Sequence, residues 1–198
     1  MAIRSLKTNS FSRSLLNGNS AFIPGSYESI ATVSVGSSGT ATISFTSIPQ
    51  TYTHLQLRYI ARNAYTGGGS YTNSDMYING DTTASHYTFH RLSGDGATAS
   101  ASAAANAGSI YVLATNANAS ANIFGVGVMD ILDYTNTNKY KTIKILDGYD
   151  NNGSGFVDGP RSGSWLSTSA VTSFSITNPA STNWVQYSRF ALYGIKVS

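Results

Sequence analysis

Strict alternation of apolar and polar residues is the feature that most restricts how this chain can fold. In residues 31–35 and 41–45, every second position holds Ala, Val, Ile or Phe, and the positions between hold Thr or Ser. Residues 55–61 largely continue the pattern. Because successive side chains of a β-strand point to opposite faces, this period of two predicts strands with one face on a core. No segment has a convincing helical period, so we expect an all-β fold.

Turn residues separate the alternating segments. Further strands are expected at 76–79, 85–92, 110–114, 123–132, 140–146, 165–166, 171–176 and 185–197, which makes about nine or ten strands in all. The turn at 36–39 predicts that 31–35 and 41–45 form a hairpin. This spacing predicts an antiparallel β-sandwich, and the long connections favour a jelly roll.

Glycine and low-complexity stretches interrupt this pattern. Gly125 and Gly127, inside an apolar segment, indicate a bulge or the close approach of another backbone. Three stretches rich in Gly, Ser, Asn or Ala are predicted to be loops, namely 63–74, 93–108 and 147–163.

Composition excludes several classes of protein. The 198 residues contain no Cys, so the chain has no disulfide, thiolate ligand or cysteine nucleophile. Only 11% of residues are charged, against roughly a quarter in an average soluble domain. With 41% hydrophobic residues, the chain is too apolar for a disordered protein. No apolar run approaches the roughly 18 residues of a membrane span, so no membrane partner is expected.

The net charge of +3 is confined to the start of the chain. Residues 1–27 contain three basic residues and no acidic one, and the other nine basic residues balance the nine acidic ones. Three scattered cations do not form the clustered patch that nucleic acid requires, so no direct nucleic-acid contact is expected. We expect residues 1–26 to be an extended anchoring arm and 27–198 to be a single sandwich domain. The residues expected to anchor the arm to a partner are Arg4, Leu6, Lys7, Phe11, Arg13, Leu15 and Phe22.

Two patterns could suggest a metal ion. His86 and His90 have a spacing that binds metal on a helix, but on a strand they lie about 13 Å apart, because each residue adds about 3.3 Å. The oxygen-rich stretch 147–158 resembles a calcium loop. When Asp150 is aligned with the first ligand of an EF-hand, however, Arg161 falls where the EF-hand places its bidentate Glu. We expect neither metal nor cofactor, with a calcium site outside the EF-hand pattern as the open alternative.

No catalytic constellation emerges from the sequence. Neither a nucleophile elbow nor a phosphate-binding loop is present. Glu28 is the only Glu, and Asp130 and Asp133 would point to opposite faces of a strand. We therefore expect a protein that is not an enzyme.

Tyrosines are frequent in the first half of the chain. Tyr59, Tyr65, Tyr71 and Tyr77 are candidates for an interface, because Tyr supplies contact area and one hydrogen bond at low entropic cost. Exposed rings could instead stack on sugars.

Both ends of the chain resemble a known group of proteins. The matching stretches are MAIRSLKT at 1–8, YESIATV at 27–33, SIPQTYTHLQLR at 47–58 and FALYGIK at 190–196. They are similar to small virion structural proteins of tailed bacteriophages, especially aquatic and cyanobacterial ones. The resemblance implies a jelly-roll module that decorates or cements a capsid, often as a trimer, or that belongs to a neck or tail fibre.

These observations lead to one functional expectation. The chain is expected to be a virion protein whose arm attaches to the major capsid protein or another virion protein, and whose body forms a homo-oligomer, with a trimer favoured. A neck, fibre or carbohydrate-binding receptor module is the alternative. A small glycosidase or lyase on the same scaffold would need two aspartates that converge in a groove.

Overall fold

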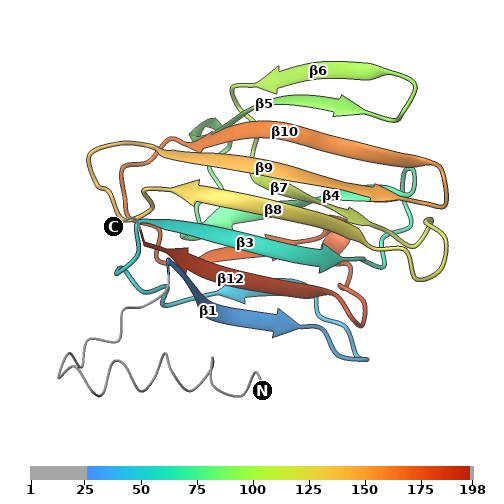
Figure 1. The fold of residues 1–198 in the computed structure, drawn as a ribbon, viewed down its shortest axis with the longest axis horizontal. Helices are drawn as coiled ribbons and strands as arrows, with labels where there is room; N and C mark the ends of the chain where they lie inside the picture. The colour runs from blue at the N-terminus through green and yellow to red at the C-terminus, as the bar shows by residue number, and fades with distance from the viewer. Residues whose placement is uncertain (1–25, 197–198) are drawn as a thin grey trace, which may run out of the picture.

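Two antiparallel sheets pack face to face in the computed structural model, which describes residues 26–196 (Figure 1). The expected antiparallel sandwich is confirmed. The large sheet has the order β1 (Tyr27–Ser34), β12 (Arg189–Ile195), β3 (His54–Ala61), β8 (Gly125–Leu132), β9 (Lys141–Asp150), β10 (Gly155–Trp165), β5 (Tyr87–Gly94) and β6 (Ala99–Ala104). The small sheet has the order β2 (Thr42–Phe45), β11 (Phe174–Thr177), β4 (Tyr71–Ile78) and β7 (Ile110–Thr115). Two short 3₁₀ turns, η1 (Ala84–His86) and η2 (Pro179–Ser181), join strands.

The alternating pattern buries one face of each sheet between the two layers. On β3, Leu55 and Leu57 are buried in the core, whereas Arg58 is exposed. Aromatic rings fill the centre, where Trp184 meets Phe190 edge-on with 4.9 Å between ring centroids. The core therefore contains the inward positions that alternation predicted on β3, together with aromatic residues such as Trp184 that lie outside the alternating segments.

The expected hairpin between 31–35 and 41–45 is wrong. β1 pairs with β12 in the large sheet, and β2 pairs with β11 in the small sheet. The turn at 36–39 therefore leads from one layer to the other. Each strand has one apolar face, and placing them in opposite layers buries both faces against each other.

The three predicted loops contain strands. The stretch 93–108 includes β6, and 147–163 includes the end of β9 and most of β10, which leaves only 151–154 as a turn. Residues 71–74 begin β4. Cross-strand side-chain hydrogen bonds, such as Ser93 to Ser100 at 2.8 Å, supply order that an Ala and Ser composition does not indicate.

Most connections cross between the two sheets. The exceptions are β5 to β6 and the run β8, β9, β10, in which consecutive strands pair within the large sheet. Strands β9, β10, β5 and β6 extend the large sheet past the small one, with β6 as its last strand (Figure 1).

Candidate functional site

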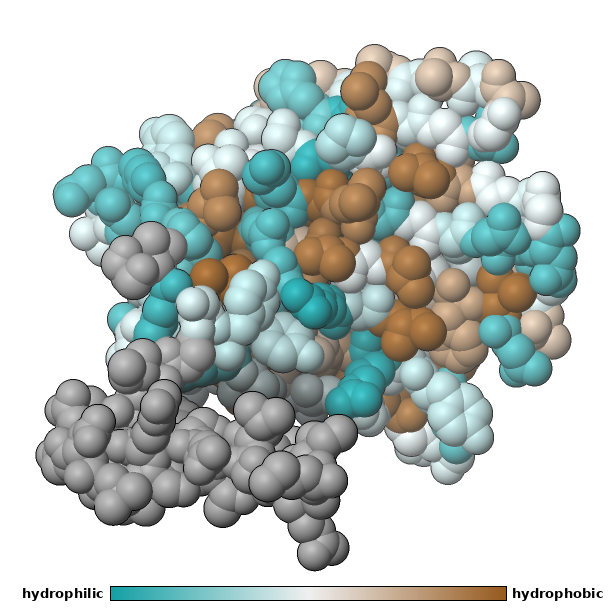
Figure 2. All heavy atoms as spheres, viewed as in Figure 1, coloured by the Kyte–Doolittle hydropathy of each residue, from teal (hydrophilic) through white to brown (hydrophobic). Residues whose placement is uncertain are grey.

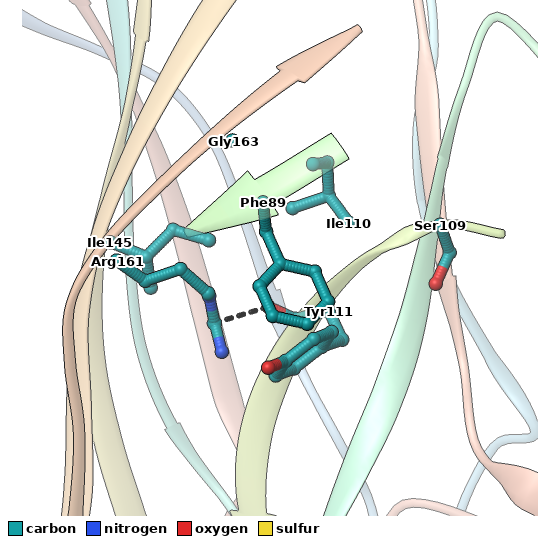
Figure 3. Close-up of a pocket in the computed structure, with 7 residues that line it drawn as sticks. All are labelled: Phe89, Ser109, Ile110, Tyr111, Ile145, Arg161 and Gly163. Carbon is teal, nitrogen blue, oxygen red and sulfur yellow. Dashed lines mark hydrogen bonds between the residues drawn. The ribbon is translucent and has the colours of Figure 1, made fainter. Parts of the chain in front are cut away.

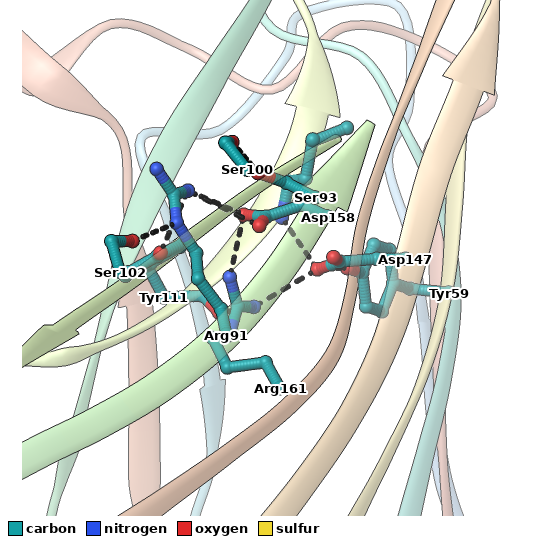
Figure 4. Close-up of polar contacts among 10 residues, drawn as sticks. Tyr59, Arg91, Ser93, Ser100, Ser102, Tyr111, Asp147, Asp158 and Arg161 are labelled. Atoms are coloured by element: carbon teal, nitrogen blue, oxygen red, sulfur yellow. Dashed lines mark hydrogen bonds and ion pairs between the residues drawn. The ribbon is translucent and has the colours of Figure 1, made fainter. Parts of the chain in front are cut away.

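A cluster of charged side chains is buried between the large sheet and the edge of the small sheet (Figure 4). Arg161 Nη1 donates to Asp158 Oδ2 at 2.8 Å, and its Nη2 donates to Asp147 Oδ2 at 3.1 Å. Arg91 on β5 donates to both carboxylate oxygens of Asp158, at 3.1 and 3.2 Å. Two cations thus meet two carboxylates, so the cluster has no net charge.

Two tyrosines complete this cluster. Tyr59 Oη donates to Asp147 Oδ2 at 2.7 Å, and the Arg161 guanidinium lies over the Tyr111 ring, 3.8 Å from its centroid. Burial raises the pKa of the Tyr59 phenol well above its ordinary value, and the neighbouring Asp147 adds to the shift. Burial disfavours the Arg161 cation, but Asp147 and its neighbours outweigh this effect and raise the pKa of the guanidinium. The phenol therefore stays protonated and the guanidinium stays charged.

The cluster closes the free edge of β7. Within residues 26–196, β4 is the only strand paired with β7, apart from one bridge between Thr115 and Arg62 at its end. Every second residue of β7 therefore directs its N–H and C=O away from the small sheet. The Leu113 N–H donates to Asp147 Oδ2 at 3.0 Å, and the Tyr111 carbonyl accepts from Arg161 Nη2 at 2.6 Å. The ion pair thereby occupies the position of a neighbouring strand. Its chemistry is that of a structural cap, because each charge is already committed to a partner.

Sequence reasoning missed this cluster. Asp147 continues the inward-facing positions of Ile143 and Ile145 on β9, so its parity places it in the core. Asp158 and Arg161 lie an odd number of residues apart, but the register shift between them on β10 turns both side chains inward. The parity of Asp147 was readable in the sequence, whereas the bulge was not.

A narrow gap beside the cluster is closed by the side chains that line it (Figure 3). Its lining consists of Phe89, Ser109, Ile110, Tyr111, Ile145, Arg161 and Gly163. It has no room for a water molecule. It is a packing seam between the layers.

A shallow groove of about 640 Å³ lies on the solvent side of β10, β5 and β6. Its lining is mainly apolar, and His90, Lys144 and Ser162 supply outward polar groups. The groove is open and holds no set of converging carboxylates.

Exposed apolar side chains gather on the solvent side of the large sheet (Figure 2). We call this surface the outer apolar face; it comprises Ile60, Leu92, Val126, Val128, Leu146 and Val157. Cross-strand register places them together: Ile60 pairs with Val126, and Val128 pairs with Leu146. Leu146 is 59% exposed and Val126 is 52% exposed. Contiguous exposed apolar surface of this kind marks protein contact sites.

The tyrosines proposed from sequence lie in different surroundings. Tyr59 is buried in the charged cluster, so it offers no exposed ring. Tyr65 and Tyr77 are half-buried and separate from each other, on the loop after β3 and on β4. Tyr71 stacks on Phe156 with 4.8 Å between ring centroids.

The two metal candidates have other roles. His86 ends η1 rather than lying on a strand, and its Nδ1 lies 2.7 Å from Asp81 Oδ2, whereas His90 is exposed on β5. The oxygen-rich stretch 147–158 forms part of a hairpin, in which Asp150 Oδ1 accepts from the Gly153 N–H at 2.9 Å. Within residues 26–196, no three His, Asp or Glu side chains lie close enough to hold a metal ion.

The predicted anchoring residues, from Arg4 to Phe22, lie outside the described residues. Within 26–196, no helix has the length and apolar character needed to cross a membrane. Comparisons with family models, curated proteins and solved structures found no match to this chain.

Proposed function

We propose that this protein is a structural subunit of a tailed-bacteriophage particle, without enzymatic activity, which decorates or cements the capsid and associates with copies of itself. The observation that carries the proposal is the outer apolar face. A free monomer gains nothing from six exposed apolar side chains on one sheet, whereas burial against another subunit would stabilise each by roughly 25 cal/mol per Å² removed from water.

A second copy is the occupant that best fits this face. Both signs of charge lie on this side of the sheet. Asp130 on β8 pairs with Lys144 on β9, and Arg58 on β3 pairs with Val128. A surface with both signs can meet its own copy without net repulsion. The balanced charge of residues 28–198 likewise lets subunits approach closely.

The strand order supports a jelly roll. Without the hairpins β5–β6 and β9–β10, eight strands remain, which run 1-8-3-6 in one sheet and 2-7-4-5 in the other when renumbered along the chain. This order corresponds to two Greek keys folded into one sandwich, the jelly roll common among viral capsid proteins. On this interpretation the two hairpins are additions that widen one sheet.

The buried charged cluster also favours a structural role. Catalytic acids and bases need access to a substrate, but Asp147, Asp158 and Arg161 are buried and paired with one another. They contribute to the closure of the sandwich.

Lysine substitutions on the outer apolar face test the proposal. Val128→Lys/Leu146→Lys alters two exposed side chains that face each other across β8 and β9, so the fold should persist. We expect analytical ultracentrifugation to show loss of the species formed through this face. Thr142→Lys, on the same face of β9, is the matched control and should associate normally. An unchanged mass distribution in the double variant would overturn the self-association.

The attachment to the capsid is tested separately. Deletion of residues 1–20 should leave the melting temperature of the sandwich nearly unchanged and abolish binding to particles, measured as occupancy by cryo-electron microscopy. Full occupancy of the truncated protein would show that the arm is not the anchor.

A glycan-binding fibre module is the second candidate. It draws on the ring cluster of Tyr71, Tyr149 and Phe156, all half-buried, with 5.6 Å between the Tyr71 and Tyr149 centroids. Binding on a glycan array that is lost in Tyr149→Ala would favour this function over decoration.

A further inference from the structure

The outermost strand of the large sheet, β6, has a free edge without protection. Within residues 26–196 it pairs only with β5, and five of its six residues are exposed. Its sequence, ASASAA, has no charge and no proline, and its register runs without a bulge from the Phe89–Ala104 pair to the Gly94–Ala99 pair. An edge of this kind is a template for another strand.

The other three outer strands carry features that discourage pairing. β1 is interrupted by a register shift between Ser29 and Ala31 and carries Glu28, and β2 is only four residues long. β7 is capped by Asp147 and Arg161. Short edges, bulges and inward-pointing charges are known means of blocking edge-to-edge association. β6 has none of them, so its open edge differs from the rest of the fold.

The inner face of β6 is fixed while its edge stays uncommitted. Ser100 bonds Ser93 at 2.8 Å, and Ser102 Oγ accepts from Arg91 Nε at 2.7 Å. These contacts hold β6 in register beside β5. Alanine is a weak strand former, so a second ladder of backbone hydrogen bonds would add stability that the side chains of β6 do not supply.

We propose that β6 pairs antiparallel with β6 of a second copy across a two-fold axis, which continues the large sheet from one subunit into the next. A two-fold contact joins the same patch on both subunits, so the patch must be self-complementary. β6 meets this condition because it has no charge to repel its counterpart. Asp95, in the β5–β6 turn, would lie at opposite ends of the paired strands in the two copies.

The pairing has a defined centre. The solvent faces of both copies lie on the same side of the joined sheet only if a residue of β6 pairs with the same residue of the second copy at the two-fold axis. In the middle of β6, this residue is Ala101 or Ser102. The small side chains at these positions let the two copies approach at ordinary strand spacing. This contact uses the backbone edge of β6, whereas the outer apolar face uses side chains on the solvent side of the sheet. The two surfaces adjoin only at Leu92, which pairs with Ala101.

Single cysteines in the full chain test the contact, because the natural sequence contains none. We expect Ala101→Cys or Ser102→Cys to form a disulfide-linked dimer at least tenfold faster than Ala97→Cys, an exposed position in the β5–β6 turn. Equal rates at all three positions would overturn the proposal.

A second variant separates the two surfaces. Ala101→Lys/Ala103→Lys places like charges on both copies at the axis and should remove the two-fold dimer, while Ala97→Lys should not. Cross-linking at 101 or 102 that persists in the Val128→Lys/Leu146→Lys background would show that the edge contact stands even where the outer-face contact fails. A dimer unaffected by Ala101→Lys/Ala103→Lys would exclude β6 as the contact.

Discussion

Arg161 on β10 donates to Asp147 on β9 across 3.1 Å, and both side chains are buried beside the free edge of β7. Together they bind one N–H and one C=O of β7, as a neighbouring strand would. A buried ion pair contributes little net stability, because the cost of removing both charges from water offsets their attraction. Its role here is to satisfy a strand edge that the small sheet leaves open.

Removal of one member of this pair should be costly. Arg161→Met leaves two buried carboxylates without their shared cation and the Tyr111 carbonyl without its donor. We expect a loss of about 3–5 kcal/mol in the free energy of unfolding, measured by urea denaturation. Arg189→Met, at an exposed position of β12, is the control and should change stability by less than about 0.5 kcal/mol. A loss below about 1 kcal/mol for Arg161→Met would contradict the capping role.

The contact between Gly127 and Tyr59 predicts a second effect. A Cβ at Gly127 would overlap the Tyr59 ring, which is fixed by its 2.7 Å hydrogen bond to Asp147. Gly127→Ala should therefore lower the free energy of unfolding by about 1–3 kcal/mol. Gly36→Ala, where the added carbon would meet no atom within 4 Å, should be neutral or slightly stabilising. Equal effects of the two substitutions on the thermal midpoint would contradict the overlap.

The sequence predicted the layers of this fold better than their connections. Alternation identified inward positions such as Leu55 and Leu57, and Gly125 meets the backbone of β7 closely, as its place in an apolar strand indicated. Strand partners were not predictable, because β1 and β12 lie at opposite ends of the chain and no local pattern links them.

The candidate site was harder to predict for physical reasons. β6 becomes a strand through contacts with β5 rather than through its own composition. The outer apolar face gathers side chains from five strands, and only cross-strand register shows that they adjoin. A pattern within one segment does not report a surface assembled from several.

Lys141 illustrates a polar residue at a core position. It is fully buried on β9, and its Nζ donates to the carbonyls of Asn136, Lys139 and Thr168 at 2.6, 3.0 and 3.2 Å. Lys141→Met removes three donors at once, so we expect a loss of roughly 2–4 kcal/mol in the free energy of unfolding. Lys144→Met on the solvent side of the same strand should have little effect. An unchanged free energy of unfolding in Lys141→Met would show that water can satisfy these carbonyls equally well.

Asp81 predicts how stability depends on pH. Burial alone would raise the pKa of this carboxyl, but hydrogen bonds from Trp165 Nε1 at 2.8 Å, from His86 and from the Thr83 N–H outweigh it and hold the pKa far below its ordinary value. A carboxyl whose pKa is lower in the folded state stabilises the fold above its unfolded pKa of about 4, and this contribution is lost as the pH falls below that value. Asp81→Asn should therefore lower the free energy of unfolding by roughly 1–3 kcal/mol at pH 7. Between about pH 4 and pH 2, the variant should lose less stability than the natural protein, as measured by urea denaturation at each pH. Asp150→Asn, at the exposed end of β9, controls for the loss of one negative charge. Parallel pH profiles for Asp81→Asn and the natural protein would contradict this assignment.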